Sequence, residues 1–221
     1  MAAGSMRTEQ RCRVITEQPL RLNKTRMVSL FLLVGLPALA DLTAGEAAYD
    51  KGDYATALTE FLPLAERGDA IAQLRLGYIY EFGRGVPQND KEAIRWFRAA
   101  AEQGNENAQF TLGFLYEVGI YEVGIGRGVR QDYKEAVRWC GMAAEQGNAS
   151  AQFFLGCMYE EGWGVAQDYI QAHMWFNLAA ANVFGNDEMA KRRDSVASKM
   201  TPEEVSLAQR LAREWKPRKT Q

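Results

Sequence analysis

A block of nine residues occurs three times in this 221-residue chain, and this recurrence constrains the fold more than any other feature. Each copy has the form Ala-Gln-x-x-Leu-Gly-x-x-Tyr, and the copies begin at Ala72, Ala108 and Ala151. Self-similarity at intervals of a few tens of residues indicates a repeat protein, in which each unit packs mainly against its neighbours. The sequence therefore predicts a stack of repeated units before it predicts any site.

A second pattern follows each block after a glycine-rich connector. It holds an alanine and a tryptophan three positions apart, which lie on one face of a helix. Block, connector and second pattern together predict a helix-turn-helix unit. The connectors are Gly83-Arg84-Gly85-Val86, Gly126-Arg127-Gly128-Val129 and Gly162-Trp163-Gly164-Val165, and the pairs are Ala93 with Trp96, Ala136 with Trp139 and Ala172 with Trp175.

The ends of each second helix carry capping residues. An Asp or Asn stands where a helix N-cap is needed, and a Glu or Gln at the third helical position completes a capping box in three of the units. A glycine follows the helix, where the left-handed conformation turns the chain back. The N-caps are Asp53, Asn89, Asp132 and Asp168, the capping-box residues are Glu92, Glu135 and Gln171, and the glycines are Gly68, Gly104 and Gly147.

One interval between units is seven residues longer than the other. The block alanines are 36 residues apart from Ala72 to Ala108 and 43 apart from Ala108 to Ala151. The excess comes from a short tandem duplication, because Tyr116-Glu117-Val118-Gly119-Ile120 is followed at once by Tyr121-Glu122-Val123-Gly124-Ile125. Seven residues could lengthen the first helix by about two turns without changing its face. The extra glycines favour a protruding surface loop instead.

These recurring motifs resemble the Sel-1-like repeat family, relatives of tetratricopeptide repeats, over residues 44 to 185. The resemblance implies an all-α fold, a right-handed α-solenoid of antiparallel helix-turn-helix repeats with a C-terminal capping helix. We expect one partial and three full repeats in residues 41–185, with capping helices and a basic tail in residues 186–221. The sequence departs from the pattern at the long interval, at Asn89-Asp90 in place of Asp-Tyr, and in the leading unit from Gly52 to Gly68, which lacks the tryptophan.

The end of the chain looks like the closing segment of bacterial members, from Gln171 through Ala181 and on to Met200-Thr201-Pro202-Glu203-Glu204. Thr201 as N-cap, Pro202 in the first turn and Glu204 three residues on predict a helix from about Pro202 to Trp215. Open-ended solenoids need such a cap, and we expect Leu207 and Leu211 to cover the last repeat. The tail is interpreted as a solvated helix end rather than a binding arm. Its basic residues are Arg210, Arg213, Lys216, Arg218 and Lys219.

The first 40 residues have the order of a secretory signal. A basic region precedes the apolar run from Val28 to Pro37, and Ala38-Leu39-Ala40 provides a small-x-small cleavage site. We expect export, to the periplasm or medium if the source is bacterial, and cleavage after Ala40. An uncleaved signal anchor or an amphipathic helix is the alternative, and translation could start at Met1, Met6 or Met27. Removing the leader's six basic and two acidic residues from totals of 26 and 28 leaves 20 and 26, so the mature protein is acidic.

The composition excludes several function classes. With 47% hydrophobic and 24% charged residues, the chain is neither disordered throughout nor a disulfide framework. The near-balance of charges offers no footprint for nucleic acid, and an acidic mature chain is not expected to adsorb to or insert stably in membranes. No phosphate-loop, zinc-protease or serine-hydrolase motif is present, and the single histidine, His173, lies within a predicted helix. We expect no catalytic residue, metal or cofactor.

The two cysteines outside the leader, Cys140 and Cys157, lie on consecutive predicted helices. In an exported protein they could form one disulfide bridge or be two buried free thiols. Disulfide-rich relatives instead carry cysteines at positions matching Ala144 and Ala151, so this pair does not follow their pattern.

A curved stack of helix pairs is typical of surfaces that hold peptides or proteins. The resemblance implies the same function, so we expect a non-enzymatic scaffold or adaptor in the cell envelope with an unidentified protein or peptide partner. The alternatives are a hydrolase acting on cell wall or β-lactams, suggested by a few relatives, and a structural subunit that self-associates rather than staying monomeric. Partner contacts are expected where the repeat varies, with packing between repeats as the other explanation. These positions are Arg75, Thr111 and Phe154 at one helical position and Tyr78 and Phe114 at another.

Overall fold

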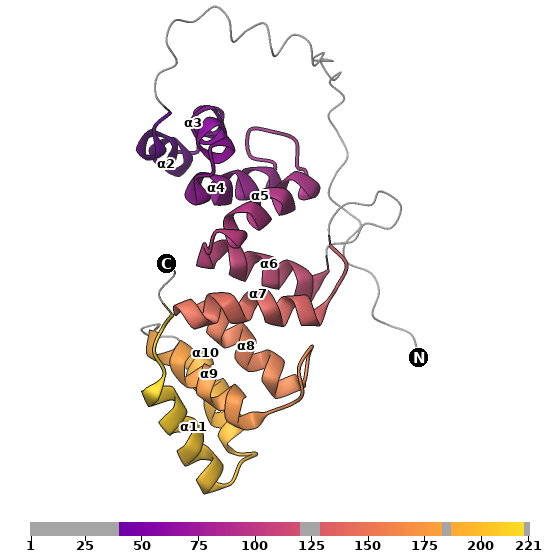
Figure 1. The fold of residues 1–221 in the computed structure, drawn as a ribbon, viewed down its shortest axis with the longest axis vertical. Helices are drawn as coiled ribbons and strands as arrows, with labels where there is room; N and C mark the ends of the chain where they lie inside the picture. The colour runs from indigo at the N-terminus through magenta and orange to yellow at the C-terminus, as the bar shows by residue number, and fades with distance from the viewer. Residues whose placement is uncertain (1–39, 120–128, 183–186, 219–221) are drawn as a thin grey trace, which may run out of the picture. The chain divides into compact units, whose positions relative to one another are not determined.

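A computed structural model describes residues 40–119, 129–182 and 187–218, and every regular element within those ranges is an α-helix. The chain divides into two units, Met1–Leu39 and Ala40–Gln221. Residues 1–39 of the predicted signal lie outside the described residues. Figure 1 labels the helices: α2 (Leu42–Asp50), α3 (Tyr54–Glu66), α4 (Ala70–Glu81), α5 (Asp90–Glu102), α6 (Glu106–Val118), α7 (Tyr133–Gln146), α8 (Ala149–Glu161), α9 (Tyr169–Asn182), α10 (Asp187–Ala197) and α11 (Pro202–Glu214).

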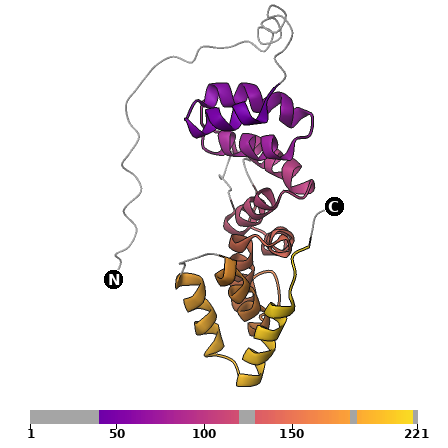
Figure 2. The same cartoon turned by 90° about the vertical axis from the view of Figure 1, so that its left-hand side faces the viewer.

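Consecutive helices pack against each other along the second unit from α2 to α10, and α11 packs on α9 (Figures 1 and 2). The block helices α4, α6 and α8 are the first helices of the three full repeats, and α5, α7 and α9 are the second helices. The expected all-α solenoid of helix pairs is therefore confirmed. No helix within the described ranges is long and apolar enough to cross a membrane.

The predicted N-caps are confirmed, but the capping boxes of the repeats are not complete. The side chains of Asp53, Asn89, Asp132 and Asp168 each accept hydrogen bonds from backbone N–H groups in the first turn. Among the helix starts that the structure describes, the reciprocal bond is found in α11, from the Thr201 N–H to the Glu204 carboxylate.

The physical reason is that the N-cap N–H already has another acceptor. Asn89, Asp132 and Asp168 donate their backbone N–H to the carbonyl oxygens of Tyr80, Tyr116 and Tyr159, each at 2.9 Å. In α5 and α7 the boxes are further prevented because Glu92 and Glu135 pair with the arginine three residues on, Arg95 and Arg138. The tyrosine that ends each block thus closes the turn to the second helix. The predicted C-terminal glycines Gly68, Gly104 and Gly147 do have positive φ angles of 96°, 91° and 104°.

The duplicated segment does not lengthen α6. This helix ends at Val118, which is equivalent to Glu161 at the end of α8, and both helices have 13 residues. Gly119 follows with a φ of 71°, so the chain turns at the normal position. The remaining residues of the duplication, from Ile120, lie outside the described residues.

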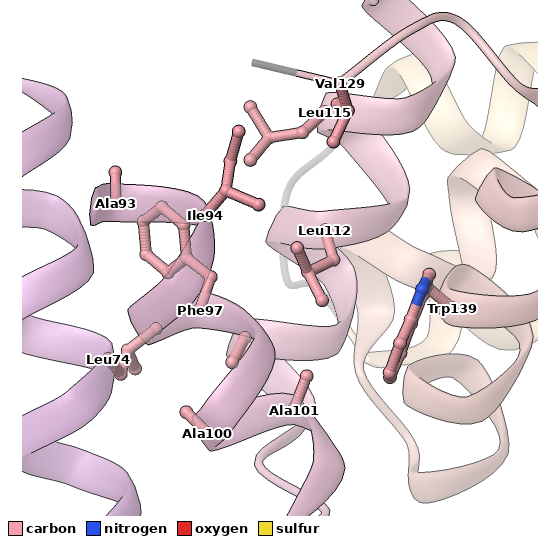
Figure 3. Close-up of a cluster of buried hydrophobic side chains, with 11 residues drawn as sticks. Leu74, Ala93, Ile94, Phe97, Ala100, Ala101, Leu112, Leu115, Val129 and Trp139 are labelled. Atoms are coloured by element: carbon pink, nitrogen blue, oxygen red, sulfur yellow. The ribbon is translucent and has the colours of Figure 1, made fainter. Parts of the chain in front are cut away.

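The core runs between successive helix pairs. Figure 3 shows one cluster, in which Phe97 and Ile94 of α5 lie against Leu112 and Leu115 of α6, with Trp139 of α7 beyond them. Phe97, Leu112 and most of the alanines in this cluster are fully buried. Burying a large apolar side chain stabilises the fold by about 1.5–3 kcal/mol, so these side chains fix the spacing of the stack.

The C-terminal helix forms where it is predicted, with one change in its packing face. In α11 the buried residues are Ala208 and Ala212, and Leu211 packs on the cluster that contains Leu155 and Trp175. Leu207 is half-buried and lines an outward-facing hollow with Arg210. The expected role of Leu211 is therefore confirmed, whereas Leu207 is not among the side chains that pack on this cluster.

Candidate functional site

The first helices carry the predicted partner contacts in neighbouring positions. We call Arg75, Tyr78, Thr111, Phe114 and Phe154 the first-helix row; they come from α4, α6 and α8. The Tyr78 hydroxyl lies 3.1 Å from Thr111 Oγ1, and the rings of Phe114 and Phe154 meet edge to face at 5.6 Å between centroids. The structure thus brings the Tyr78 or Phe114 position of one repeat against the Thr111 or Phe154 position of the next.

The members of the row differ in what they leave open to a partner. Phe114 is 41% exposed, which is unusual for a phenylalanine, whereas Tyr78 and Phe154 are half-buried. Thr111 is buried, and its hydroxyl donates to the carbonyl of Asn107 at 2.8 Å, so Tyr78 is the donor in their shared bond. Thr111 therefore serves packing between repeats, while Phe114 is the open contact.

Arg75 is already engaged within the chain. Its Nε and Nη2 atoms bond the two carboxylate oxygens of Glu46 on α2 at 2.7 and 2.5 Å, and its guanidinium lies over the Tyr49 ring. The bidentate bond to Glu46 is the main cause that raises the pKa of Arg75 above its ordinary value. Arg75 thus ties α2 to α4, and a partner would meet the pair rather than a lone cation.

A groove of about 940 Å³ lies beside the row, between the α4 face and the C-terminal segment. Ile71, one turn before Arg75, is 45% exposed in it. Sequence reasoning missed Ile71, although Asn107 and Ser150 at the equivalent positions show that this position varies. The other lining residues are Leu74, Arg75 and Tyr78 of α4, Gly104, Asn105, Glu106 and Asn107 before and in α6, Gln146 of α7, and Pro217 and Arg218.

Aromatic side chains extend the row toward the connectors. Phe82 is 58% exposed and stacks on Tyr78 with ring centroids 6.3 Å apart. The guanidinium of Arg84 lies over the Phe82 ring and donates to the Tyr49 hydroxyl at 2.6 Å. The exposed apolar surface of the first helices therefore continues past the end of α4.

Burial shifts the pKa values of the two described cysteines and of the single histidine. Burial raises the pKa of Cys140 to about 12 and that of Cys157 to about 11, which suppresses the nucleophilic thiolate. His173 is buried, and desolvation lowers its pKa. Among the described residues, no group of three or more His, Cys, Asp or Glu side chains is placed to hold a metal ion.

The two cysteines are free thiols rather than a disulfide. The sulfur of Cys140 lies against Gly113 of α6, where it would clash with an added Cβ. Cys157 packs with Ala172, Phe176 and Val196 of α9 and α10. The two side chains serve different helix contacts, which explains why their position on consecutive helices does not make a bridge.

Glu160 forms a buried ion cluster at the end of α8. Its side chain is 4% exposed and pairs with Arg192 of α10 at 3.1 Å and with Lys199 at 2.9 Å. A buried carboxylate needs such partners, so this cluster fastens α10 and the following turn to the last repeat. Glu161, the next residue, is exposed.

Comparisons with known proteins agree with the geometry. The Sel1 repeat family model matches residues 70–105, 107–148 and 149–183. A solved Sel1 repeat protein from Oxalobacter formigenes is 41% identical, with a TM-score of 0.55, and the match covers 62% of this chain and 97% of that one. A protective antigen of uropathogenic Escherichia coli with an SLR fold is 26% identical over 79% of this chain and 52% of its own, with a TM-score of 0.39.

No curated protein matches the chain. The matched repeats span α4 to α9, which are the helices that carry the first-helix row. Sel1 repeats are generally modules of protein–protein interaction and typically have no catalytic role. With three consecutive repeats that cover half of its length, the chain belongs to the Sel1 repeat family.

Proposed function

We propose that this protein is a non-enzymatic scaffold that holds a protein partner along the first-helix row. The observation that carries the proposal is the exposure of Phe114 at the centre of the row, beside Phe154 and one repeat away from Tyr78 and Phe82. Exposed aromatic side chains of this kind are enriched in protein interfaces, where they bury large areas at low entropic cost. The neighbouring groove adds Ile71, whose apolar side chain is 45% exposed.

A hydrolase is not proposed. The thiols of Cys140 and Cys157 have raised pKa values, and the described carboxylate with the deepest burial, Glu160, is paired with two cations. None of these groups lies in the groove.

The scaffold is proposed to work in the cell envelope or outside the cell. The support is the order of basic region, apolar run and small-residue site in residues 1–40, together with a compact unit that starts at Ala40. Mass spectrometry of protein expressed from Met1 tests this directly. A mature chain that begins at Asp41 in the envelope or medium is expected, and a full-length chain retained in the cytoplasm would contradict it.

The interaction surface is tested by retention of partners on immobilised protein. Phe114→Ala and Phe82→Ala are expected to weaken retention of a specific partner at least tenfold, because each removes an exposed aromatic ring from the row or its extension. Arg75→Glu is unsuitable as a first probe, since it would also break the contact with Glu46 that holds α2.

Met142→Ala is the matched control. Met142 is 39% exposed on the second helix α7, close to the 41% of Phe114, so the two changes remove similar apolar surface from opposite helix rows. Equal losses for Phe114→Ala and Met142→Ala, or no loss for either, would contradict a partner on the first helices.

A further inference from the structure

The chain does not project into solvent after α11 but returns to the stack. We call Trp215-Lys216-Pro217-Arg218 the strap. Trp215 ends α11 with φ −64° and ψ 140°, which is an extended conformation of the polyproline type. The tail was interpreted from its sequence as a solvated helix end; Lys216 and Arg218 are indeed exposed, but the strap also makes specific contacts with the stack.

Three contacts hold the strap. The Trp215 ring meets the Trp175 ring of α9 edge to face at 6.3 Å. Pro217 lies next to Gly147, where an added Cβ would be 3.8 Å from the Pro217 Cβ. Arg218 donates its backbone N–H to the carbonyl of Glu145 at 2.7 Å and its Nη1 to the Glu145 carboxylate at 2.8 Å.

We call Glu145, Gly147 and Trp175 the corner. Glu145 lies in the last turn of α7, where backbone carbonyls have no partner further along the helix and are open to other donors. Gly147 turns the chain in a left-handed conformation, and with no side chain it leaves room for Pro217. The corner is therefore a carbonyl acceptor, a carboxylate and an aromatic surface around a space without side chains.

These are the elements by which proteins recognise extended peptides. A main-chain hydrogen bond fixes the extended backbone, an aromatic side chain provides an anchor, and a charged pair adds selectivity. Lys216, between Trp215 and Pro217, is exposed. Pro217 and Arg218 also line the groove beside the first-helix row, so the corner adjoins the surface proposed for the partner.

We propose that the corner is a recognition site for an extended peptide segment in which an aromatic residue precedes an arginine by three positions, and that the chain's own strap fills this site. The proposal deepens the scaffold function and rests on it, because it names the class of segment that a partner would insert at this end of the groove. The tethered strap has an effective concentration in the millimolar range. A partner segment must therefore displace it.

The test uses a labelled peptide, acetyl-Glu-Trp-Lys-Pro-Arg-amide, and fluorescence anisotropy. In a released variant of the full chain, Trp215→Gly, Lys216→Ser, Pro217→Gly and Arg218→Ser remove the strap's side chains. The peptide is expected to bind this variant at least tenfold more tightly than the unchanged protein, because the strap no longer competes. Glu145→Lys added to the released variant should weaken binding at least tenfold, and so should a peptide with glutamate in place of its arginine.

Arg213→Ser is the matched control, since it removes a basic residue from the last turn of α11 without touching the strap. It should leave peptide binding as weak as in the unchanged protein. A second variant, Arg218→Glu with Pro217→Gly, keeps Trp215 and serves as the test if the four-residue change lowers the helical circular dichroism. This second variant should bind the peptide several-fold more tightly than the unchanged protein.

Two results would overturn the proposal. One is a folded released variant that does not bind the peptide, and the other is equal binding by the released, control and unchanged proteins. Neither result bears on the scaffold function, which is read from partner retention and its dependence on Phe114. If Phe114→Ala left partner retention unchanged while the peptide bound as expected, the result would count against the scaffold function alone.

Discussion

The middle repeat and its two neighbours solve the same packing problem differently. Each first helix has a glycine at the centre of its contact with the second helix. In the first and third repeats a buried phenylalanine covers it: Phe97 lies on Gly77 and Phe176 lies on Gly156. In the middle repeat the covering residue is Cys140, on Gly113.

The small thiol lets the backbones approach. The three atoms nearest to a Cβ built on Gly77 are all ring atoms of Phe97, whereas those nearest to one built on Gly113 are the Cys140 sulfur, the Cys140 nitrogen at 3.0 Å and the Ala136 carbonyl oxygen at 3.2 Å. At Gly113, where the covering side chain is small, backbone atoms of α7 are therefore among the nearest neighbours of the added Cβ. The repeat requires the glycine, while the covering side chain can change if the helices move together.

The largest expected effect breaks the contact in the first repeat. Phe97 is fully buried, so Phe97→Ala should lower the free energy of unfolding by about 3–5 kcal/mol through lost burial and the cavity it leaves. Cys140→Ala removes a single sulfur atom and should cost only about 1 kcal/mol. Urea unfolding followed by circular dichroism compares the two. Similar losses of stability would show that the middle repeat depends on its covering side chain as much as the first repeat does.

Alanine at the glycines sharpens the comparison. Gly77→Ala and Gly113→Ala should each lower the free energy of unfolding by about 1–3 kcal/mol, as overpacking does. Gly113→Ala should cost more, because the backbone atoms it meets cannot turn aside as a ring can. Thermal unfolding of both variants gives the order, and a larger loss at Gly77 would contradict the close approach of α6 and α7.

The thiols of the middle and third repeats should differ in reactivity. Burial raises the pKa of Cys140 to about 12 and that of Cys157 to about 11, and Cys157 is also partly exposed. One pKa unit is a tenfold difference in thiolate, or about 1.4 kcal/mol. Alkylation of folded protein at pH 8, mapped by mass spectrometry, should modify Cys157 at least tenfold faster. Faster modification of Cys140 would place that thiol outside the core.

The smallest effect comes from a glycine in the middle repeat that has no close neighbour. Gly141 lies in α7, and no atom within 4 Å would meet an added Cβ. Gly141→Ala should raise the free energy of unfolding by about 0.5–1 kcal/mol, since alanine favours the helix. A loss of stability, measured by urea unfolding as for the other variants, would mean that Gly141 is needed in this repeat although it lies outside the close contact between the helices.

The features that the sequence predicts are those with local causes. Asp132 and Gly147 cap α7 because capping depends on the residues next to a helix end, and the spacing of the blocks determines the succession of helix pairs. Contacts between distant segments carry no such local signal. The pairing of Arg75 with Glu46, 29 residues away, removes a predicted contact from the free surface, and Arg218 bonds Glu145 across 73 residues.

The candidate site also contains residues that the sequence predicts correctly and residues whose role depends on distant contacts. Phe114 and Tyr78 were found because the repeat varies there while the packing positions stay constant. Thr111 varies for a different reason, since its hydroxyl bonds Tyr78 and Asn107 within the stack. A variable position is thus a candidate contact. Its burial in the structure then shows whether the side chain is open to a partner or packs between repeats.

The central claim is that a partner lies on the first helices, and site-specific photo-crosslinking tests it most directly. A photoreactive phenylalanine is placed at Phe114 of α6 in one protein and at Met142 of α7 in another, at 41% and 39% exposure. Both are irradiated in the native compartment. The account predicts a discrete crosslinked product from Phe114 and none from Met142. Equal products from both positions, or a product from Met142 alone, would contradict it.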